Sequence, residues 1–358
     1  MQRNIKSLTL LGSLLSCVLV GQVCAAELKV IDQIKVPGAG LQSFDISYMD
    51  QVNNRYYLAD RTNKALDIID AKTGKFIAQV TGFVGAKGPD EGGPNGVVVV
   101  GDEAWVGDGD STVKVVDLKT NKIVDTVATG GKNRADEVAY DPKNQVFIVA
   151  NDAEEPPFLT LISTKPGHKI IKKISLPDAT DGLEQSIYYA PKGVFLTAIP
   201  QLKGNETIGG IATIDPVKGE IIKVMNVANC APAGLAQGPD HNLVIGCATG
   251  DKKSKQKPVT VVINGDTGAE VARIAGIGAA DEVAYSAKNG QYYITATKMA
   301  KGPALGIIDA KTNTLVQTIS TGGNTHSVAT NDANGHVFLP TPKTAGTCDG
   351  CILVYGTK

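Results

Sequence analysis

The sequence lacks most of the motifs that mark the common enzyme classes. It contains no Gly-x-Ser-x-Gly elbow, no phosphate-binding P-loop, no His-Glu-x-x-His pair and no haem-attachment or NAD-binding motif. One tryptophan, Trp105, and four histidines occur in 358 residues. The histidines are scattered at His168, His241, His326 and His336. These absences argue against a nucleophilic hydrolase, a zinc protease and a haem or NAD enzyme.

An excess of charge of one sign is also missing. The 35 basic and 36 acidic residues nearly cancel, which leaves a formal net charge of −1. A chain this close to neutral carries no electrostatic footprint for nucleic acid. We therefore expect no nucleic-acid partner.

Long hydrophobic runs are absent as well. The apolar run Leu8 to Val20 is shorter than the ~20 residues that a membrane-spanning helix needs. It follows Arg3 and Lys6 and precedes small residues at 23–26, which is the pattern of a secretory signal. We expect residues 1–26 to be a signal peptide, and residues 27–358 to be one periplasmic or secreted domain without a transmembrane segment. A membrane anchor and a lipoprotein cleavage at Cys17 are the alternatives.

Cysteine is scarce, but its placement is informative. Four cysteines follow residue 26, and an even number favours disulfides in an oxidising compartment. Cys230 and Cys247 bracket two consecutive predicted strands, whose antiparallel pairing brings their ends together. Cys348 and Cys351 have the spacing of a redox motif but lie in a β context, so we expect a structural bridge, with redox chemistry or metal binding as alternatives. The predicted pairs are Cys230–Cys247 and Cys348–Cys351.

A repeated signature fills most of the remaining chain. A short apolar run is followed by Asp, or a substitute for it, and then by Lys, Thr, Gly or Asn. The signature recurs at intervals of roughly 45–52 residues. Its successive copies are centred on Asp70, Asp117, Ser163, Asp215, Asn264 and Asp309. Such a period indicates a repeat architecture.

Each repeat has the pattern of four short strands joined by hairpin turns. The clearest repeat has apolar stretches at 97–100, 104–107, 113–116 and 122–127. Four antiparallel strands repeated in this way are typical of propeller blades. The last repeat supplies three strands, at Ser327 to Thr330, His336 to Leu339 and Cys351 to Tyr355, and the segment 28–36 resembles the outer strands of the others. We predict an all-β, seven-bladed β-propeller with four antiparallel strands per blade, whose last blade is closed by the N-terminal strand.

The Asp-x-Lys-Thr-Gly/Asn turns and the aromatic-rich second strands at 56–60, 147–151 and 292–296 carry a resemblance to a known family. Over essentially all of the predicted domain, the chain resembles the YVTN/YncE-type β-propellers of bacteria. The resemblance implies the fold strongly and the function weakly, because such propellers include ligand binders, scaffolds, lactonases, lyases and cofactor enzymes. With Trp105 as the only tryptophan, the stacked tryptophan ring of propellers that bind the quinone cofactor PQQ is missing.

In a propeller, the first strand of each blade begins near the central channel at one face. Six of the seven predicted entrances offer an oxygen or nitrogen ligand, and the remaining one is Ala233–Gly234. The predicted ligand or metal site is a funnel lined by Asp45, Asn95, Asp136, Glu137, Glu184, Asp281, Glu282 and His326. Oxygen ligands with one imidazole suit a single divalent cation, with Ca²⁺, Mn²⁺ or Zn²⁺ as candidates. Alternatively, these groups bond loop backbones or water in a wet channel.

Two functions are compatible with this pattern. The first is a binding protein that takes a small ligand, a divalent metal or a protein partner at the funnel and on a loop-rich face, formed by the connections between second and third strands. The second is a metal-assisted hydrolase, lactonase or lyase acting on an oxygen-rich small molecule. Its candidate catalytic residues are Glu137, Glu282, His326 and Arg134. Arg134 would clamp a substrate carboxylate, or else form a salt bridge to the neighbouring acids.

Overall fold

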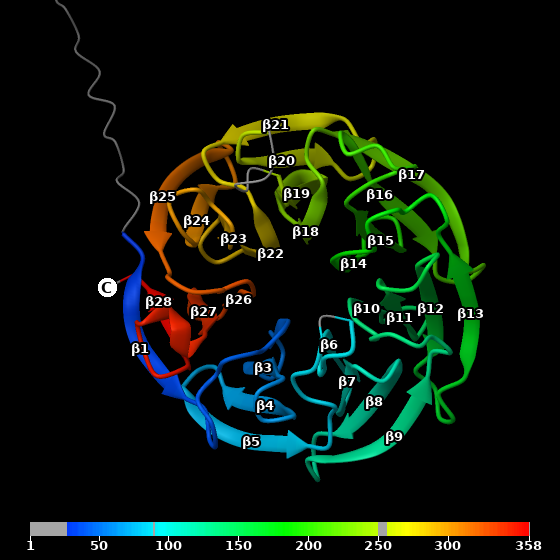
Figure 1. Cartoon of the computed structure of the whole chain (residues 1–358), viewed down its shortest axis with the longest axis horizontal. Helices are drawn as coiled ribbons and strands as arrows, with labels where there is room; N and C mark the ends of the chain where they lie inside the picture. Colours follow the sequence, from blue (N-terminus) through cyan, green and yellow to red (C-terminus); the bar gives the residue numbers. More distant parts are fainter. Residues whose placement is uncertain (1–26, 89, 250–255, 358) are drawn as a thin grey trace, which may run out of the picture.

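The computed structural model describes residues 27–88, 90–249 and 256–357. The predicted signal peptide, with Cys17, lies outside the described residues. Within them, the chain forms seven four-stranded antiparallel sheets arranged around a central axis (Figure 1). The fold is the predicted all-β, seven-bladed β-propeller.

Each blade runs from an inner strand beside the axis to an outer strand at the rim. In that order the strands are β2 (Ser47–Asp50), β3 (Arg55–Asp60), β4 (Ala65–Asp70) and β5 (Lys75–Thr81) in blade 1; β6 (Val97–Val100), β7 (Glu103–Gly107), β8 (Thr112–Asp117) and β9 (Lys122–Ala128) in blade 2; β10 (Val138–Asp141), β11 (Val146–Asn151), β12 (Phe158–Ser163) and β13 (Ile170–Ser175) in blade 3; β14 (Ser186–Tyr189), β15 (Val194–Ile199), β16 (Ile208–Asp215) and β17 (Glu220–Ala228) in blade 4; β18 (Pro232–Gln237), β19 (Asn242–Cys247), β20 (Val259–Asn264) and β21 (Glu270–Ala275) in blade 5; β22 (Ala280–Ser286), β23 (Gln291–Ala296), β24 (Ala304–Asp309) and β25 (Thr314–Ser320) in blade 6; and β26 (Ala329–Asn331), β27 (His336–Thr341), β28 (Cys351–Gly356) and β1 (Lys29–Lys35) in blade 7. Two short 3-10 turns, η1 (Pro239–His241) and η2 (Lys343–Ala345), are the helical elements of the described ranges.

The ring is closed by the two ends of the described chain. β1 pairs antiparallel with β28, from Lys29 opposite Gly356 to Lys35 opposite Cys351. Blade 7 is therefore built from both ends, as predicted, and neither end leaves an open sheet edge inside the ring. The backbone of Leu28 also exchanges two hydrogen bonds of 3.0 Å with the side chain of Gln317 in blade 6.

The repeated signature forms the turn between the third and fourth strands. In blade 1, Oδ1 of Asp70 accepts the backbone N–H groups of Lys72 at 3.0 Å and Thr73 at 2.8 Å. The pairing of these two strands shifts register at Ile68/Ile69, and the same shift recurs at the matching position of blades 2 to 6. A bulge at this position increases the local strand twist. The signature thus fixes the same local geometry six times.

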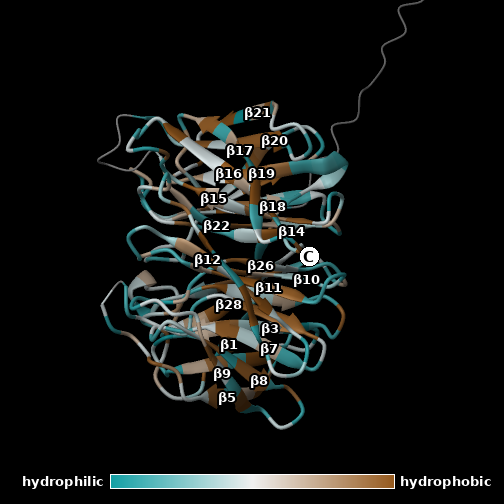
Figure 2. Ribbon diagram, turned by 90° about the vertical axis from the view of Figure 1, so that its right-hand side faces the viewer, coloured by the Kyte–Doolittle hydropathy of each residue, from teal (hydrophilic) through white to brown (hydrophobic). Residues whose placement is uncertain are grey.

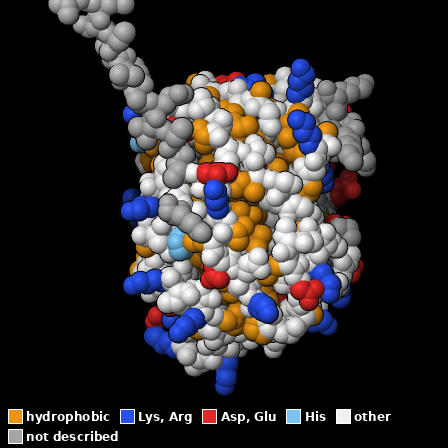
Figure 3. Space-filling view, turned by 90° about the vertical axis from the view of Figure 1, so that its left-hand side faces the viewer, with side chains coloured by type: hydrophobic (Ala, Val, Ile, Leu, Met, Phe, Trp, Pro, Cys, Tyr) orange, Lys and Arg blue, Asp and Glu red, His pale blue; other side chains and the backbone are white. Residues whose placement is uncertain are grey.

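The core lies between the blades and is densest around the second strands. Tyr56, Tyr57, Trp105 and Tyr292 are fully buried there, because the middle of a blade packs against neighbours on both faces. Figure 2 shows the hydrophobic residues concentrated in the strands and the hydrophilic ones in the loops. The outer strands are mostly exposed, and β9 and β25 alternate exposed and half-buried side chains. On the rim shown in Figure 3, charged side chains of both signs are dispersed among hydrophobic and uncharged ones.

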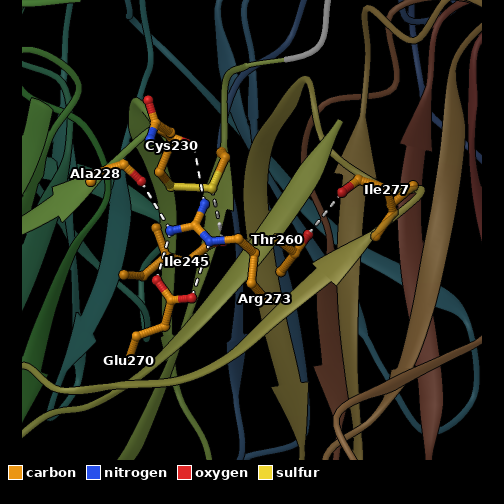
Figure 4. The surroundings of a disulfide bond; sticks show 9 residues. Ala228, Cys230, Ile245, Thr260, Glu270, Arg273 and Ile277 are labelled. Atoms are coloured by element: carbon orange, nitrogen blue, oxygen red, sulfur yellow. Dashed lines mark hydrogen bonds and ion pairs between the residues drawn. A yellow bond between two sulfur atoms is a disulfide. The ribbon is translucent and has the colours of Figure 1, made fainter. Parts of the chain in front are cut away.

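Both predicted disulfides are present. Cys230–Cys247, with Cα atoms 4.7 Å apart, links the start of β18 to the end of β19 in blade 5 (Figure 4). Beside it, the guanidinium of Arg273 on β21 donates hydrogen bonds to the carbonyl oxygens of Ala228 at 3.0 Å and Asn229 at 3.2 Å. These contacts tie blade 5 to the end of blade 4. The second disulfide, Cys348–Cys351, closes the short loop that enters β28.

Candidate functional site

The entrances of the inner strands converge on one cavity at the axis. Its volume is about 490 Å³. Of the predicted site residues, the cavity is lined by Asp45, Arg134, Asp136, Glu137, Glu184, Asp281, Glu282 and His326. We call this cavity the funnel. Asn95 is the exception, since it is fully buried behind the wall and does not line the funnel.

Asn95 acts on the funnel through Arg61. Its Oδ1 accepts hydrogen bonds from Nε of Arg61 at 3.1 Å and from Nη2 at 2.5 Å. Its Nδ2 donates to the carbonyl oxygen of Ala135 at 2.7 Å, which fixes the orientation of the amide. The guanidinium of Arg61, held in this way, forms an ion pair with Asp45. The prediction that Asn95 is a ligand of the funnel is therefore replaced by a positioning contact, because its amide oxygen already serves the arginine.

His326 completes this first group. Its Nε2 lies 3.4 Å from Oδ1 of Asp45, and its ring stacks on Phe44 with centroids 4.8 Å apart. Burial alone would raise the pKa of Asp45, but the charge of Arg61 and the hydrogen bond from His326 hold it well below its usual range. Burial alone would lower the pKa of His326, but the hydrogen bond to Asp45 and the charges of Asp281 and Asp45 raise it. Asp45 is thus a carboxylate at neutral pH, matched by cations.

A second arginine neutralises the next group of acids. Nη2 of Arg134 lies 2.7 Å from Oδ2 of Asp136 and 2.7 Å from Oδ2 of Asp152. The charges of Asp136 and Asp152 raise the pKa of Arg134 further above its ordinary value. Of the two interpretations of Arg134, the salt bridge to a neighbouring acid is confirmed. The second partner, Asp152, comes from the loop after β11 and was not predicted.

The remaining carboxyls are different, because they face each other. Glu137 and Glu282 are each 5% exposed, and each of the two side chains affects the pKa of the other. Burial, followed by the charges of neighbouring acids such as Glu282 and Asp281, raises the pKa of both well above the ordinary value of 4.5. Glu184 is affected in the same way by burial, Asp281 and Glu137. Among the residues that the structure describes, Glu137, Glu184 and Glu282 form no ion pair.

Blade 5 contributes a close backbone approach to the funnel wall in place of a charge. A Cβ atom added to Gly234 would lie 2.3 Å from the carbonyl oxygen of Asp281. The side chain of Gln185 fills the same region, since its Oε1 accepts the backbone N–H of Leu235 at 2.5 Å. The inner strands of blades 5 and 6 are therefore pressed together. This explains why the Ala233–Gly234 entrance carries no ionisable group.

Comparisons with known proteins identify no relative that would indicate what the funnel binds. No protein-family profile and no curated protein matches the chain. The YVTN/YncE resemblance therefore stays a prediction, and the chemistry of the funnel has to be argued from its own residues. In the described residues, no helix is long and apolar enough to cross a membrane.

Of the seven lining residues that the sequence analysis did not predict, three bear on the chemistry of the funnel, namely Arg61, Lys298 and Phe44. Arg61 and Lys298 come from the connections between second and third strands in blades 1 and 6, which confirms that these loops open on the funnel face. Phe44 precedes Asp45 and supplies the ring under His326. An ion pair with Asp45 holds Arg61 in the funnel, whereas Lys298 is exposed, and the only signal for either residue was a position on that loop face.

The arrangement of the funnel carboxylates can be compared with what a divalent cation would need as ligands. Across the described ranges, no three His, Cys, Asp or Glu side chains are placed to ligate one metal ion. Asp45 and Asp136 are already bonded to arginines, which removes two of the predicted ligands. Glu137, Glu184, Asp281 and Glu282 remain as oxygen donors for a positively charged group. The funnel is thus divided into a part where acids are paired with arginines and a part where, among the described residues, acids have no ion pair.

Proposed function

We propose that this protein is an exported, YVTN/YncE-type β-propeller that binds a small positively charged ligand in its central funnel. The observation that carries the proposal is the Glu137–Glu282 pair. Two carboxyls that are each 5% exposed line the same cavity and have no ion pair among the described residues. Burying such groups is costly unless they are protonated or meet a cation. A cationic ligand would supply the missing partner.

The charges around the pair support a ligand of this sign. Arg61 and Arg134 are engaged by Asp45, Asp136 and Asp152. Lys298, the remaining basic side chain of the lining apart from His326, lies exposed at the mouth. A negatively charged ligand would have to approach Glu137, Glu184, Asp281 and Glu282 against their repulsion. A cation would instead lower the cost of ionising them.

Export of the domain is supported by two features. The first is the signal-like segment 1–26. The second is the pair of disulfides, which are typical of oxidising compartments such as the periplasm and the cell exterior. Binding of a small molecule outside the cytoplasm is consistent with both of these features and with the funnel.

Thermal unfolding of the mature domain with a panel of cations tests the proposal. The probes are CaCl₂, MnCl₂, ZnCl₂ and ethylammonium chloride, with sodium acetate as the anionic comparison. At about 100 times its dissociation constant, a bound cation adds about 2.7 kcal/mol of stability. We expect at least one cation to raise the Tm and acetate to leave it unchanged. If no cation raises the Tm, the proposal is wrong.

A matched pair of variants locates the effect. Glu137→Gln/Glu282→Gln removes the two funnel charges, whereas Glu220→Gln/Glu270→Gln removes two charges from the exposed outer strands β17 and β21. We expect the first variant to lose the cation-induced shift and the second to keep it. An equal shift in both variants would place the cation elsewhere and overturn the assignment. Glu137→Gln alone serves the same purpose if the double variant does not unfold cooperatively.

A further inference from the structure

A second cavity adjoins the funnel along the inner strands. It has a volume of about 280 Å³ and lies among the first strands of blades 1 to 4. Its lining is largely apolar and aromatic, with Tyr48, Val98, Val138, Tyr140, Ile187 and Tyr188. Ile46 and Glu137 line both this cavity and the funnel. Glu137 therefore stands at the boundary between a charged chamber and an apolar one.

The tyrosines of the second cavity contribute mainly ring surface. The ring of Tyr48 lies 6.4 Å from that of Tyr57, and the ring of Tyr188 lies 5.9 Å from that of Phe195, measured between centroids. The valine and isoleucine side chains beside them have no polar atoms. Apolar chambers of this kind gain free energy by taking apolar surface out of water. Because an engineered apolar cavity of about 150 Å³ accommodates benzene, the second cavity has room for one ring with a short chain.

We infer that the ligand is an organic ammonium ion with an aromatic or aliphatic group. This inference rests on the proposed function and specifies its ligand class. The ammonium group lies against Glu137 and Glu282, and the apolar group occupies the cavity lined by Tyr140 and Ile187. A metal ion would use the carboxylates alone and leave the second cavity without a role. Aromatic rings next to the carboxylates add cation–π attraction for an ammonium but none for a neutral molecule.

Calorimetric titration of the mature protein with three small molecules tests the inference. Phenethylammonium carries both charge and ring, ethylammonium carries the charge alone, and 2-phenylethanol carries the ring alone. Burial of a phenyl ring corresponds to a gain in affinity of roughly 10-fold or more. We therefore expect phenethylammonium to bind at least roughly 10-fold more tightly than either of the others.

The outcomes separate this inference from the proposed function. Equal affinities for phenethylammonium and ethylammonium would overturn the role of the second cavity while the cationic funnel stands. Equal affinities for phenethylammonium and 2-phenylethanol would overturn the role of Glu137 as the ammonium site. Binding of none of the three, together with a Tm that no metal ion raises, would remove both proposals. Metal binding without ammonium binding would overturn the inference alone.

Filling the second cavity provides an independent test. Val138→Phe on β10 and Ile187→Trp on β14 each place extra bulk in the lining. Val124→Phe on the outer strand β9, where Val124 is 56% exposed, is the matched control. We expect the filled variants to bind ethylammonium as the wild type does and to lose the roughly 10-fold preference for phenethylammonium. If both filled variants retain the preference, the apolar group binds elsewhere and the inference is wrong.

Discussion

The carboxylates of the outer turns and those of the funnel are the same chemical group in opposite surroundings. At the rim, Asp70 accepts two backbone N–H groups, and Asp117, Asp215 and Asp309 repeat this arrangement. The hydrogen bond from the backbone of Thr73 is the main cause that lowers the pKa of Asp70. In the funnel, burial and neighbouring acids raise the pKa of Glu137, Glu184 and Glu282.

The opposite pKa shifts separate carboxyls that stabilise the fold from carboxyls that are costly to ionise in the protein without a ligand. Each turn carboxylate is satisfied within its own hairpin, and the same arrangement occurs in four of the seven blades. The funnel carboxyls differ from one blade to the next, and Glu137 and Glu282, which affect each other's pKa, come from different blades. The turns are therefore complete without any ligand. The acidic part of the funnel remains electrostatically unbalanced, which is why we place the function there.

The largest effect should come from removing the cation that neutralises the funnel acids. Arg134→Met leaves Asp136 and Asp152 without their shared guanidinium, and breaking such a buried pair costs about 3–5 kcal/mol. Arg273→Met at the rim removes a more exposed ion pair to Glu270, worth about 1 kcal/mol or less, and exposed hydrogen bonds to the carbonyl oxygens of Ala228 and Asn229, which water can replace. Denaturant unfolding of both variants, with disulfides intact, measures the two costs. Similar costs would show that the funnel acids are no more dependent on compensation than the rim acids.

Replacing glycine by alanine should destabilise the funnel wall more than a rim turn, but by a smaller difference in unfolding free energy than the arginine variants. A Cβ at Gly234 meets the backbone oxygen of Asp281 at 2.3 Å, and overpacking of this kind costs about 2–3 kcal/mol. In the turn, Gly74 has a φ of +69°, so alanine there is strained by about 1 kcal/mol. The nearest atom to a Cβ at Gly74 is at the flexible end of Asp32. Equilibrium unfolding should rank Gly234→Ala below Gly74→Ala in stability. The reverse order would contradict the close packing of blades 5 and 6.

The smallest effect should appear in the pH dependence of the free energy of unfolding. There, however, the funnel and the turn carboxyls should differ in sign. A carboxyl with a raised pKa stabilises the fold below its unfolded pKa and loses that contribution as pH rises through the folded pKa. Glu137→Gln should therefore be more stable than the wild type by about 1 kcal/mol at neutral pH, and the gain should fade towards pH 4.5, the ordinary value for Glu. Asp70 has a lowered pKa, so its contribution is present above the ordinary value of 3.8 and is lost as pH falls through the folded pKa.

Unfolding free energies of Glu137→Gln and Asp70→Asn, measured from about pH 3 to pH 8, test these signs. Asp70→Asn should be less stable than the wild type at neutral pH and equal to it in acid. A Glu137→Gln variant that is destabilised at neutral pH would show that the carboxylate has a stabilising partner in the apo protein. Curves of the same sign for both variants would remove the contrast between turn and funnel.

Most of the fold could be predicted because it is encoded locally. The Asp-x-Lys-Thr-Gly turn specifies its own hydrogen bonds, and the strand stretches at 97–100 and 122–127 match β6 and β9 closely. Closure by the segment 28–36 followed from counting strands, and β1 occupies 29–35. The last inner strand was less well placed, since Ser327–Thr330 was expected and β26 is Ala329–Asn331.

The funnel could be predicted only in outline, because its chemistry depends on contacts between blades. The inner-strand entrances brought together Asp45, Glu137 and Glu282 as expected. The sequence did not indicate that Asn95, which lies behind the funnel wall, would bind the guanidinium of Arg61, because the two residues are 34 positions apart. Nor did it indicate that Arg134 would reach Asp152 in the following loop. Such pairings depend on loop paths that no local pattern encodes.

Closure of the ring by β1 and β28 has a consequence for how the protein is made. β1 is the first strand of the described chain to be synthesised, and it waits for β28, the last strand of the fold. A chain truncated before β28 would expose both the edge of β27 and the edge of β1, and bare edges of this kind invite aggregation and proteolysis. Sealing of the last blade therefore requires both β1 and β28, so a copy that lacks either strand keeps an unpaired sheet edge in the ring.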